Sequence, residues 1–109
     1  MDLNLWFGSV LVGRVHGAFQ SETTWFGSVE LAINPEDGDL PRRLLAYVTF
    51  CKDWNERERT GSADPAEFDG YADVVESGRW FTTNAAGDTT GITDAPIFFI
   101  ENDVSWTNV

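Results

Sequence analysis

The chain has 109 residues and carries 18 acidic against 7 basic side chains, which gives a formal net charge of −11 at pH 7. This charge repels phosphate backbones and argues against nucleic-acid binding, whereas it attracts a basic protein or a cation. Hydrophobic residues make up 42% of the chain and aromatic residues 14%, which argues against a disordered protein and favours a single globular domain spanning residues 1–109.

The pentapeptide Trp-Phe-Gly-Ser-Val occurs twice, as residues 6–10 and as residues 25–29. Side-chain alternation predicts that the first copy lies in a strand over residues 3–15 and the second in a strand over residues 25–33. The Trp, Gly and Val side chains of each copy then share one face. We expect that face to lie under the main helix of the protein.

The two predicted strands differ on their opposite face, where Glu30 of the second stands at the position of Leu11 in the first. The second strand is therefore expected to be the more peripheral one. Gly8 and Gly27 lie inside the predicted strands, and glycine there is typical of a bulge or bend. Residues 15–22 form either a loop or a further short strand.

A turn and a long helix follow. Residues 34–39 combine Pro, Gly and three carboxylates, which predicts a turn, but their spacing does not match an EF-hand loop. A helix over residues 40–59 is predicted by apolar residues at spacings of three and four. Gly61 is expected to end it in the left-handed conformation. The apolar stripe consists of Leu40, Leu44, Tyr47, Cys51 and Trp54.

A second helix is predicted directly afterwards. Asp64 is a helix-capping residue, Pro65 suits the first helical position, and Glu67 completes a capping box. The helical periodicity continues to about Glu76, although residues 71–76 could also open a strand. We favour the helix.

The last third of the chain contains three predicted strands, over residues 79–83, 97–101 and 104–109. A polar loop over residues 84–91 and a turn at residues 102–103 separate them. The whole pattern favours an α+β fold in the order strands, helix, helix, strands. We expect an antiparallel sheet of about five or six strands with both helices packed on one face.

The charges are distributed unevenly, because residues 41–60 hold five of the seven basic side chains. The interpretation that we favour is a solvated helix face with weak ion pairs. The alternative is a contact between this basic helix and the acids of the second helix, which are Glu67, Asp69, Asp73 and Glu76.

The pattern of reactive side chains predicts no enzymatic activity, metal or cofactor. His16 is the only histidine and Cys51 the only cysteine, and their spacing does not place a base beside a nucleophile. One residue of each kind is too few for a zinc site, and phosphate-binding glycine motifs are absent. A calcium site in residues 34–39, or around Asp88 and Asp94, stays open as an alternative.

The setting is expected to be cytoplasmic. A single cysteine, Cys51, allows no intrachain disulfide. The first residues lack the basic segment of a signal peptide, and Gly8, Gly13 and Arg14 interrupt an apolar run that is too short to cross a membrane.

Five tryptophans are many for this length. Trp6, Trp25 and Trp54 lie on otherwise apolar faces and are predicted to belong to the core. Trp80 and Trp106 have Thr, Ser and Asn neighbours and are the candidates for exposure.

In acidity, tryptophan content and expected fold the chain resembles the small α+β proteins that protect bacteria from secreted toxins. Our leading hypothesis is a non-enzymatic protein-binding module, an inhibitor or immunity-type protein that neutralises a basic partner such as a toxin. The predicted partner-binding residues are those of the second helix, with Tyr71 as an aromatic anchor. They are Asp64, Glu67, Asp69, Tyr71, Asp73 and Glu76.

Two other functions stay open. Trp80 and Trp106 could form a platform for a carbohydrate or another small molecule, or the acidic surface could imitate DNA. The pattern does not specify the partner or an oligomeric state.

Overall fold

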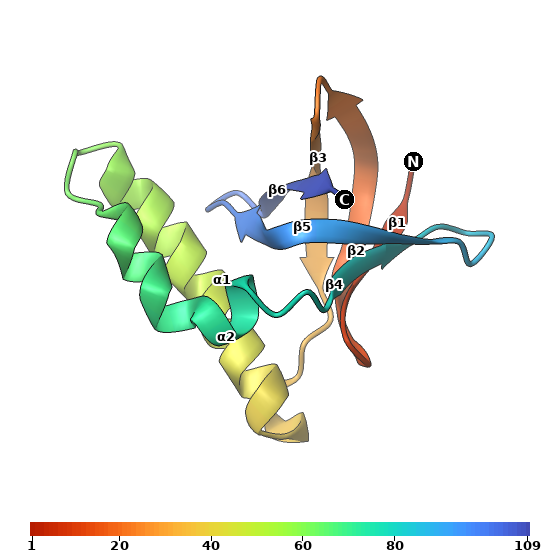
Figure 1. Cartoon of the computed structure of the whole chain (residues 1–109), viewed down its shortest axis with the longest axis horizontal. Helices are drawn as coiled ribbons and strands as arrows, with labels where there is room; N and C mark the ends of the chain where they lie inside the picture. Colours follow the sequence, from red (N-terminus) through yellow and green to blue (C-terminus); the bar gives the residue numbers. More distant parts are fainter.

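The computed structural model describes residues 1–109, and its six strands close into one antiparallel barrel with the helices at one end (Figure 1). The order around the barrel is β1-β2-β3-β6-β5-β4, and β4 pairs with β1 to complete the circle. The strands are β1 (Leu3–Phe7), β2 (Val10–Ser21), β3 (Thr24–Leu31), β4 (Trp80–Thr83), β5 (Thr89–Phe98) and β6 (Asp103–Asn108). The helical elements between β3 and β4 are the 3-10 helix η1 (Pro35–Asp37), α1 (Asp39–Glu58), the 3-10 helix η2 (Pro65–Tyr71) and α2 (Ala72–Val75).

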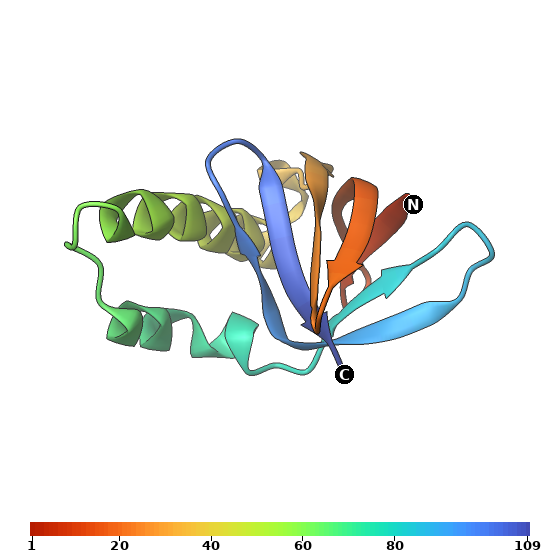
Figure 2. The same ribbon diagram turned by 90° about the horizontal axis from the view of Figure 1, so that it is seen from above.

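The closed barrel corrects the expected open sheet, although the antiparallel pairing and the six strands agree with the sequence. The pairing of β1 with β4 places Leu5 opposite Thr82, and no local pattern indicates a contact between such distant segments. Closure leaves no unpaired strand edge. The expected packing of both helices on one sheet face is not confirmed: α1 packs against one end of the barrel, and η2 and α2 run back beside it as the second arm of a hairpin (Figure 2).

The first pentapeptide is not a continuous strand. Gly8 and Ser9 form a turn between β1 and β2, in which Gly8 has a φ of +57° and its N–H donates to the Arg79 carbonyl at 3.0 Å. Phe7 then faces the barrel interior. Trp6 faces outward, stacks on Phe81 and donates its indole N–H to a threonine hydroxyl. The prediction of one strand over residues 3–15 is therefore wrong.

The second pentapeptide lies entirely within β3, as predicted. Val29 is buried in the barrel, and Trp25 and Gly27 share its inward face, whereas Phe26 is 37% exposed on the outside. The inward aromatic ring is thus the phenylalanine in the first copy and the tryptophan in the second. The expectation that both copies use the same face is wrong.

Strand β2 includes residues 15–21, so the segment for which the sequence allowed either a loop or a strand is a strand as far as Ser21. It contains a bulge, because His16 pairs with Ser28 and Phe19 pairs with Phe26. Gly17 within the bulge has a φ of +63°. Bulges change the direction of a strand and of its side chains, and beyond this one Phe19 lies on the outer surface.

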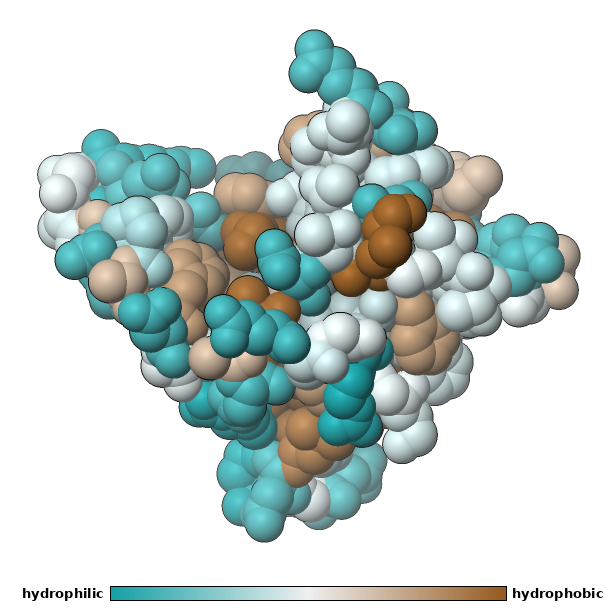
Figure 3. Space-filling model, viewed as in Figure 1, coloured by the Kyte–Doolittle hydropathy of each residue, from teal (hydrophilic) through white to brown (hydrophobic).

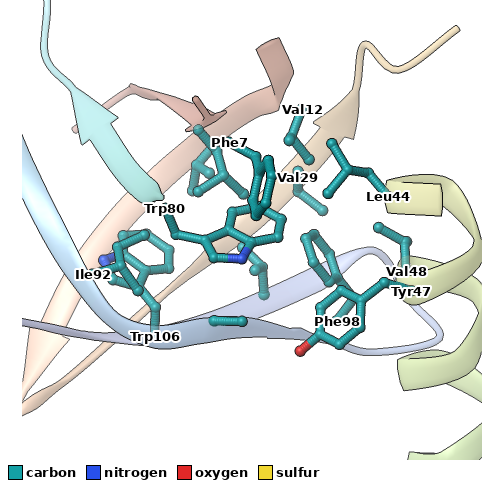
Figure 4. Close-up of a cluster of buried hydrophobic side chains, with 14 of the residues drawn as sticks. Phe7, Val12, Val29, Leu44, Tyr47, Val48, Trp80, Ile92, Phe98 and Trp106 are labelled. Atoms are coloured by element: carbon teal, nitrogen blue, oxygen red, sulfur yellow. The ribbon is translucent and has the colours of Figure 1, made fainter. Parts of the chain in front are cut away.

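Helix α1 covers one end of the barrel, as Figure 4 shows from the inside. Its boundaries agree with the predicted helix to within one residue. Tyr47 donates its hydroxyl to the Pro96 carbonyl at 2.8 Å and lies beside Trp80 and Phe98. Trp54 of the predicted stripe does not reach the barrel. The buried side chains of α1 are Leu44, Tyr47, Val48 and Cys51.

The predicted capping signals are confirmed, because the Asp64 carboxylate accepts from the Ala66 N–H and the Glu67 carboxylate accepts from the Asp64 N–H. Gly61 adopts the left-handed conformation with a φ of +76°. The second helix is, however, a 3-10 segment followed by a single α-turn. Residues 71–75 are therefore helical rather than strand, and Glu76 lies in the turn that follows.

The C-terminal strands follow the prediction with shifted boundaries. Strand β5 begins at Thr89, inside the predicted loop, and contains a register shift near Asp94, which has a φ of +58°. The last turn lies at residues 99–102 rather than 102–103. Trp80 and Trp106 are 1% and 4% exposed, so the prediction that they are the exposed tryptophans is wrong. No helix is both long and apolar enough to cross a membrane.

Candidate functional site

The helical hairpin is held together by ion pairs between the basic face of α1 and the acids that follow it. The Arg43 guanidinium lies 2.8 Å from an Asp73 carboxylate oxygen and 4.2 Å from the centre of the Tyr71 ring. Arg57 donates to both oxygens of Glu67 at 2.8 and 2.9 Å. For these two arginines the structure shows the alternative interpretation, a contact between the basic helix and the acids of the second helix.

A small aromatic cluster supports the same hairpin. Phe50 of α1 stacks on Tyr71 at 4.7 Å between ring centres and meets Phe68 edge-on at 4.9 Å. Trp54 also contacts Phe68 and donates its indole N–H to the Asp64 carbonyl at 2.9 Å. These rings lie outside the barrel and pack the two arms of the hairpin against each other.

The hairpin contacts engage four of the predicted partner-binding residues. Asp64 caps η2, Glu67 and Asp73 pair with arginines, and Tyr71 packs between Arg43 and the aromatic rings of α1. Asp69 and Glu76 are exposed and form no ion pair. The six residues therefore include two carboxylates that remain available to a partner.

The ion pair with Arg57 lowers the pKa of Glu67. The guanidinium hydrogen bonds are the main cause of a lowered pKa for Glu67, followed by the Asp64 backbone N–H. A lowered pKa favours the ionised form in the folded state. This contribution is present above the ordinary carboxyl pKa and is lost as the pH falls through the lowered pKa.

We predict that Arg57→Gln raises the pKa of Glu67 towards its ordinary value, though not fully, because the Asp64 N–H still donates. NMR titration of the side-chain carboxyl measures the change. Arg42→Gln is the matched control, since Arg42 pairs with Asp39 instead. An unchanged Glu67 titration in the Arg57 variant would contradict the pairing.

A second candidate surface lies on the outside of the barrel, over β2, β3 and the β5–β6 turn. Phe19 and Phe26 pair across β2 and β3, stack at 5.6 Å between ring centres, and are 58% and 37% exposed. Phe99, at the start of the turn, also lines this hollow. A stacked aromatic pair this far outside the core is an unusual use of apolar surface.

Acids border these rings. Asp103 lines the hollow beside Phe19 and Phe26, and Glu30 and Glu101 line the adjoining one. His16 belongs to both hollows and lies within 3.5 Å of the Asp2 carboxylate and 3.3 Å of that of Glu30. No lysine or arginine lines either hollow. We call this surface the Phe19–Phe26 face, formed by His16, Phe19, Phe26, Glu30, Phe99, Glu101 and Asp103.

The space-filling view in Figure 3 shows one side of the protein. There hydrophilic residues cover the projecting helices and the loop tips, and hydrophobic residues form separate small areas between them. Exposed single apolar residues of this kind are normal on a soluble surface.

The structure keeps the two reactive side chains of the chain apart. Cys51 is buried beside Tyr47 and Phe98, and burial raises the pKa of its thiol. His16 contacts carboxylates on the outer surface. The chain also contains no cluster of three or more His, Cys, Asp or Glu side chains arranged to hold a metal ion.

Sequence reasoning missed the Phe19–Phe26 face for two reasons. Phe19 belongs to a segment that was left open between loop and strand, and only the bulge at Gly17 sets its outward direction. Phe26 was assigned to the wetter face of its strand, which is its position in the structure, but its partner across the sheet was not predictable. Comparisons of the chain with protein-family models, with curated proteins and with solved structures gave no match.

Proposed function

We propose that this protein is an acidic protein-binding module of the inhibitor or immunity type, which neutralises a basic partner such as a toxin. The observation that carries the proposal is the Phe19–Phe26 face, where exposed stacked rings adjoin the carboxylates of Glu30, Glu101 and Asp103. An aromatic centre with a charged rim is the usual composition of a protein-binding hot spot.

Charge complementarity selects the partner. The net charge of −11 steers a basic protein towards the molecule, and the local carboxylates of Glu30, Glu101 and Asp103 favour its cationic groups. The rings of Phe19 and Phe26 supply apolar area that a partner can cover. We therefore propose the outer face of the barrel as the site in place of the second helix, since Asp64, Glu67 and Asp73 of that helix are engaged within the hairpin.

We predict that the double variant Phe19→Ala/Phe26→Ala loses the partner, while Asp69→Lys/Glu76→Lys on the helix retains it. Wild type and both variants serve as parallel baits at physiological salt, with a lysate of the native host. A basic protein held by the wild type is then purified and titrated by calorimetry. The phenylalanine variant should weaken binding at least about tenfold, as expected for hot-spot residues.

Four outcomes would contradict the proposal. Equal binding by the phenylalanine variant would mean that the two rings do not contact the partner. A loss of binding only in the helix variant would mean that the second helix is the site. Binding that depends on Glu30, Glu101 and Asp103 but not on the rings would instead favour an acidic DNA mimic. Self-association through the same face, seen by light scattering and abolished by the phenylalanine variant, would identify a second copy as the occupant.

A further inference from the structure

The barrel has a pocket of about 200 Å³ at the end remote from α1. Figure 4 shows Trp106 on the opposite side of Trp80 from Leu44 and Val48 of the helix. Side chains from β1, β3, β4, β5 and β6 meet at this end, among them Leu3 and Thr90. Mouths of barrels are common positions for small-ligand sites, and this one shares no lining residue with the Phe19–Phe26 face.

Two tryptophans form one wall of this pocket. Trp25 and Trp106 are directly paired across β3 and β6, and their rings lie nearly parallel at 6.2 Å between centres. Trp106 is 4% exposed and is held in the core, whereas Trp25 is half-buried. The wall is therefore rigid and leaves aromatic surface accessible from the pocket.

The lining also contains hydrogen-bond donors without a protein acceptor. Trp6, Trp54, Trp80 and Trp106 each donate the indole N–H to a protein oxygen, but Trp25 does not. The Trp106 N–H uses the side-chain oxygen of Asn108, which leaves the Asn108 amide N–H groups free to donate.

Acceptors are present beside these donors. Asp88 lines the pocket, and one of its carboxylate oxygens accepts from Asn84 while the other has no side-chain partner. Thr82 is the only buried polar residue that the core contains, at 4% exposure, and it and Thr90 bring hydroxyls that both donate and accept.

We propose that this pocket binds a single neutral sugar ring. The C–H face of a sugar packs against an indole, and each sugar hydroxyl both donates and accepts, as the mixed lining requires. An anion would be repelled by Asp88 and by the net charge of −11. The charged nitrogen of an ammonium ligand cannot accept a hydrogen bond, so it would leave the N–H groups of Trp25 and Asn108 without an acceptor.

The size of the pocket also supports a single sugar ring as the ligand. At about 200 Å³ it is smaller than the pockets that hold drug-sized ligands, so one ring is the appropriate occupant. The site differs from the platform of Trp80 and Trp106 expected from the sequence, because Trp80 is sealed in the core and Trp25 takes its place.

The experiment is an NMR titration of the nitrogen-15-labelled full chain with glucose, galactose and N-acetylglucosamine, and with choline as the cationic comparison. We expect at least one sugar to shift the Trp25 indole N–H and the Asn108 amide signals saturably, with a dissociation constant in the range of about 1 mM. Trp25→Phe keeps an aromatic ring but removes the donor and should weaken binding about five- to tenfold. Trp6→Phe, on the outer surface, should leave the affinity unchanged.

Several results would overturn the proposal. These are the absence of saturable shifts with every sugar, saturation by choline instead, or equal affinity in the wild type and the Trp25→Phe variant. Because wild type alone answers the first question, a poorly folded variant does not affect it. Failure here leaves the protein-binding proposal intact, since that proposal is tested with the Phe19–Phe26 variants.

Discussion

Replacing Trp80 with alanine should lower the free energy of unfolding by about 3–5 kcal/mol, in the range measured when large buried side chains are truncated. Trp80 is 1% exposed and meets Phe7 edge-on at 5.1 Å between ring centres. Tyr47 and Phe98 lie at 6.3 and 6.5 Å from it, so the ring connects the barrel strands to α1. Its indole N–H also donates to the Val74 carbonyl at 3.0 Å, which ties α2 to the barrel.

Urea unfolding followed by far-ultraviolet circular dichroism measures this loss, and avoids the fluorescence that the substitution itself removes. Trp6→Ala is the matched control, because Trp6 lies half-buried outside the barrel with one stacked ring and one hydrogen bond. Its loss should be about 1–2 kcal/mol. Equal losses at the two positions would mean that Trp80 is not the centre of the core.

That Trp80 is buried could not be predicted from its neighbours in the sequence. Its strand alternates Trp80 and Thr82 against Phe81 and Thr83, and the threonine on the Trp80 face suggested a wet surface. In the barrel Thr82 is buried and lines the pocket next to Trp106, so one inward face holds a buried indole and a hydroxyl together. Only the pairing of β4 with both β1 and β5 shows which face is inward.

Features that depend on neighbouring residues in the sequence were predicted more accurately than the contacts between distant strands. The capping box at Asp64, the left-handed Gly61 and the apolar stripe of α1 each depend on residues within a few positions, and the structure contains all three. The ion pairs of the hairpin depend instead on how α1 and η2 approach each other. The sequence therefore indicated that Arg57 and Glu67 carry complementary charges, but not that they form an ion pair with each other.

The candidate sites were the least predictable feature, because each combines distant segments. Phe19 and Phe26 are close in sequence but reach one surface only through the bulge in β2. Trp25 and Trp106 come from strands at opposite ends of the chain, and their register decides that the rings stack. Aromatic content alone could indicate surplus rings, not where they gather.

The repeated pentapeptide shows most clearly that neighbouring strands decide conformation. In the first copy β1 and β2 pair with each other, so Gly8-Ser9 becomes the turn that joins them. In the second copy β3 pairs with β2 on one side and β6 on the other, so the same five residues stay extended. Gly8 therefore adopts a positive φ in a turn, whereas Gly27 lies in an extended strand.

Glycine-to-asparagine substitution at the two equivalent positions should therefore destabilise the protein to very different extents. Gly27→Asn should cost about 3–5 kcal/mol, because its Cβ would overlap the fully buried Val15 side chain and its amide would enter an apolar region. Gly8→Asn should cost less than about 1 kcal/mol. Asparagine tolerates the positive φ of Gly8, and the atoms in its way belong to the flexible end of Arg79.

Urea unfolding of the two variants, measured side by side, provides the comparison. Val15→Ala combined with Gly27→Asn removes the overlapping methyl groups, so the two losses should be less than additive if the overlap is the cause. Similar losses at positions 8 and 27 would mean that both pentapeptides adopt one conformation. A cost confined to Gly27 would show that the repeat shares a sequence while each copy takes its conformation from the strands that pair with it.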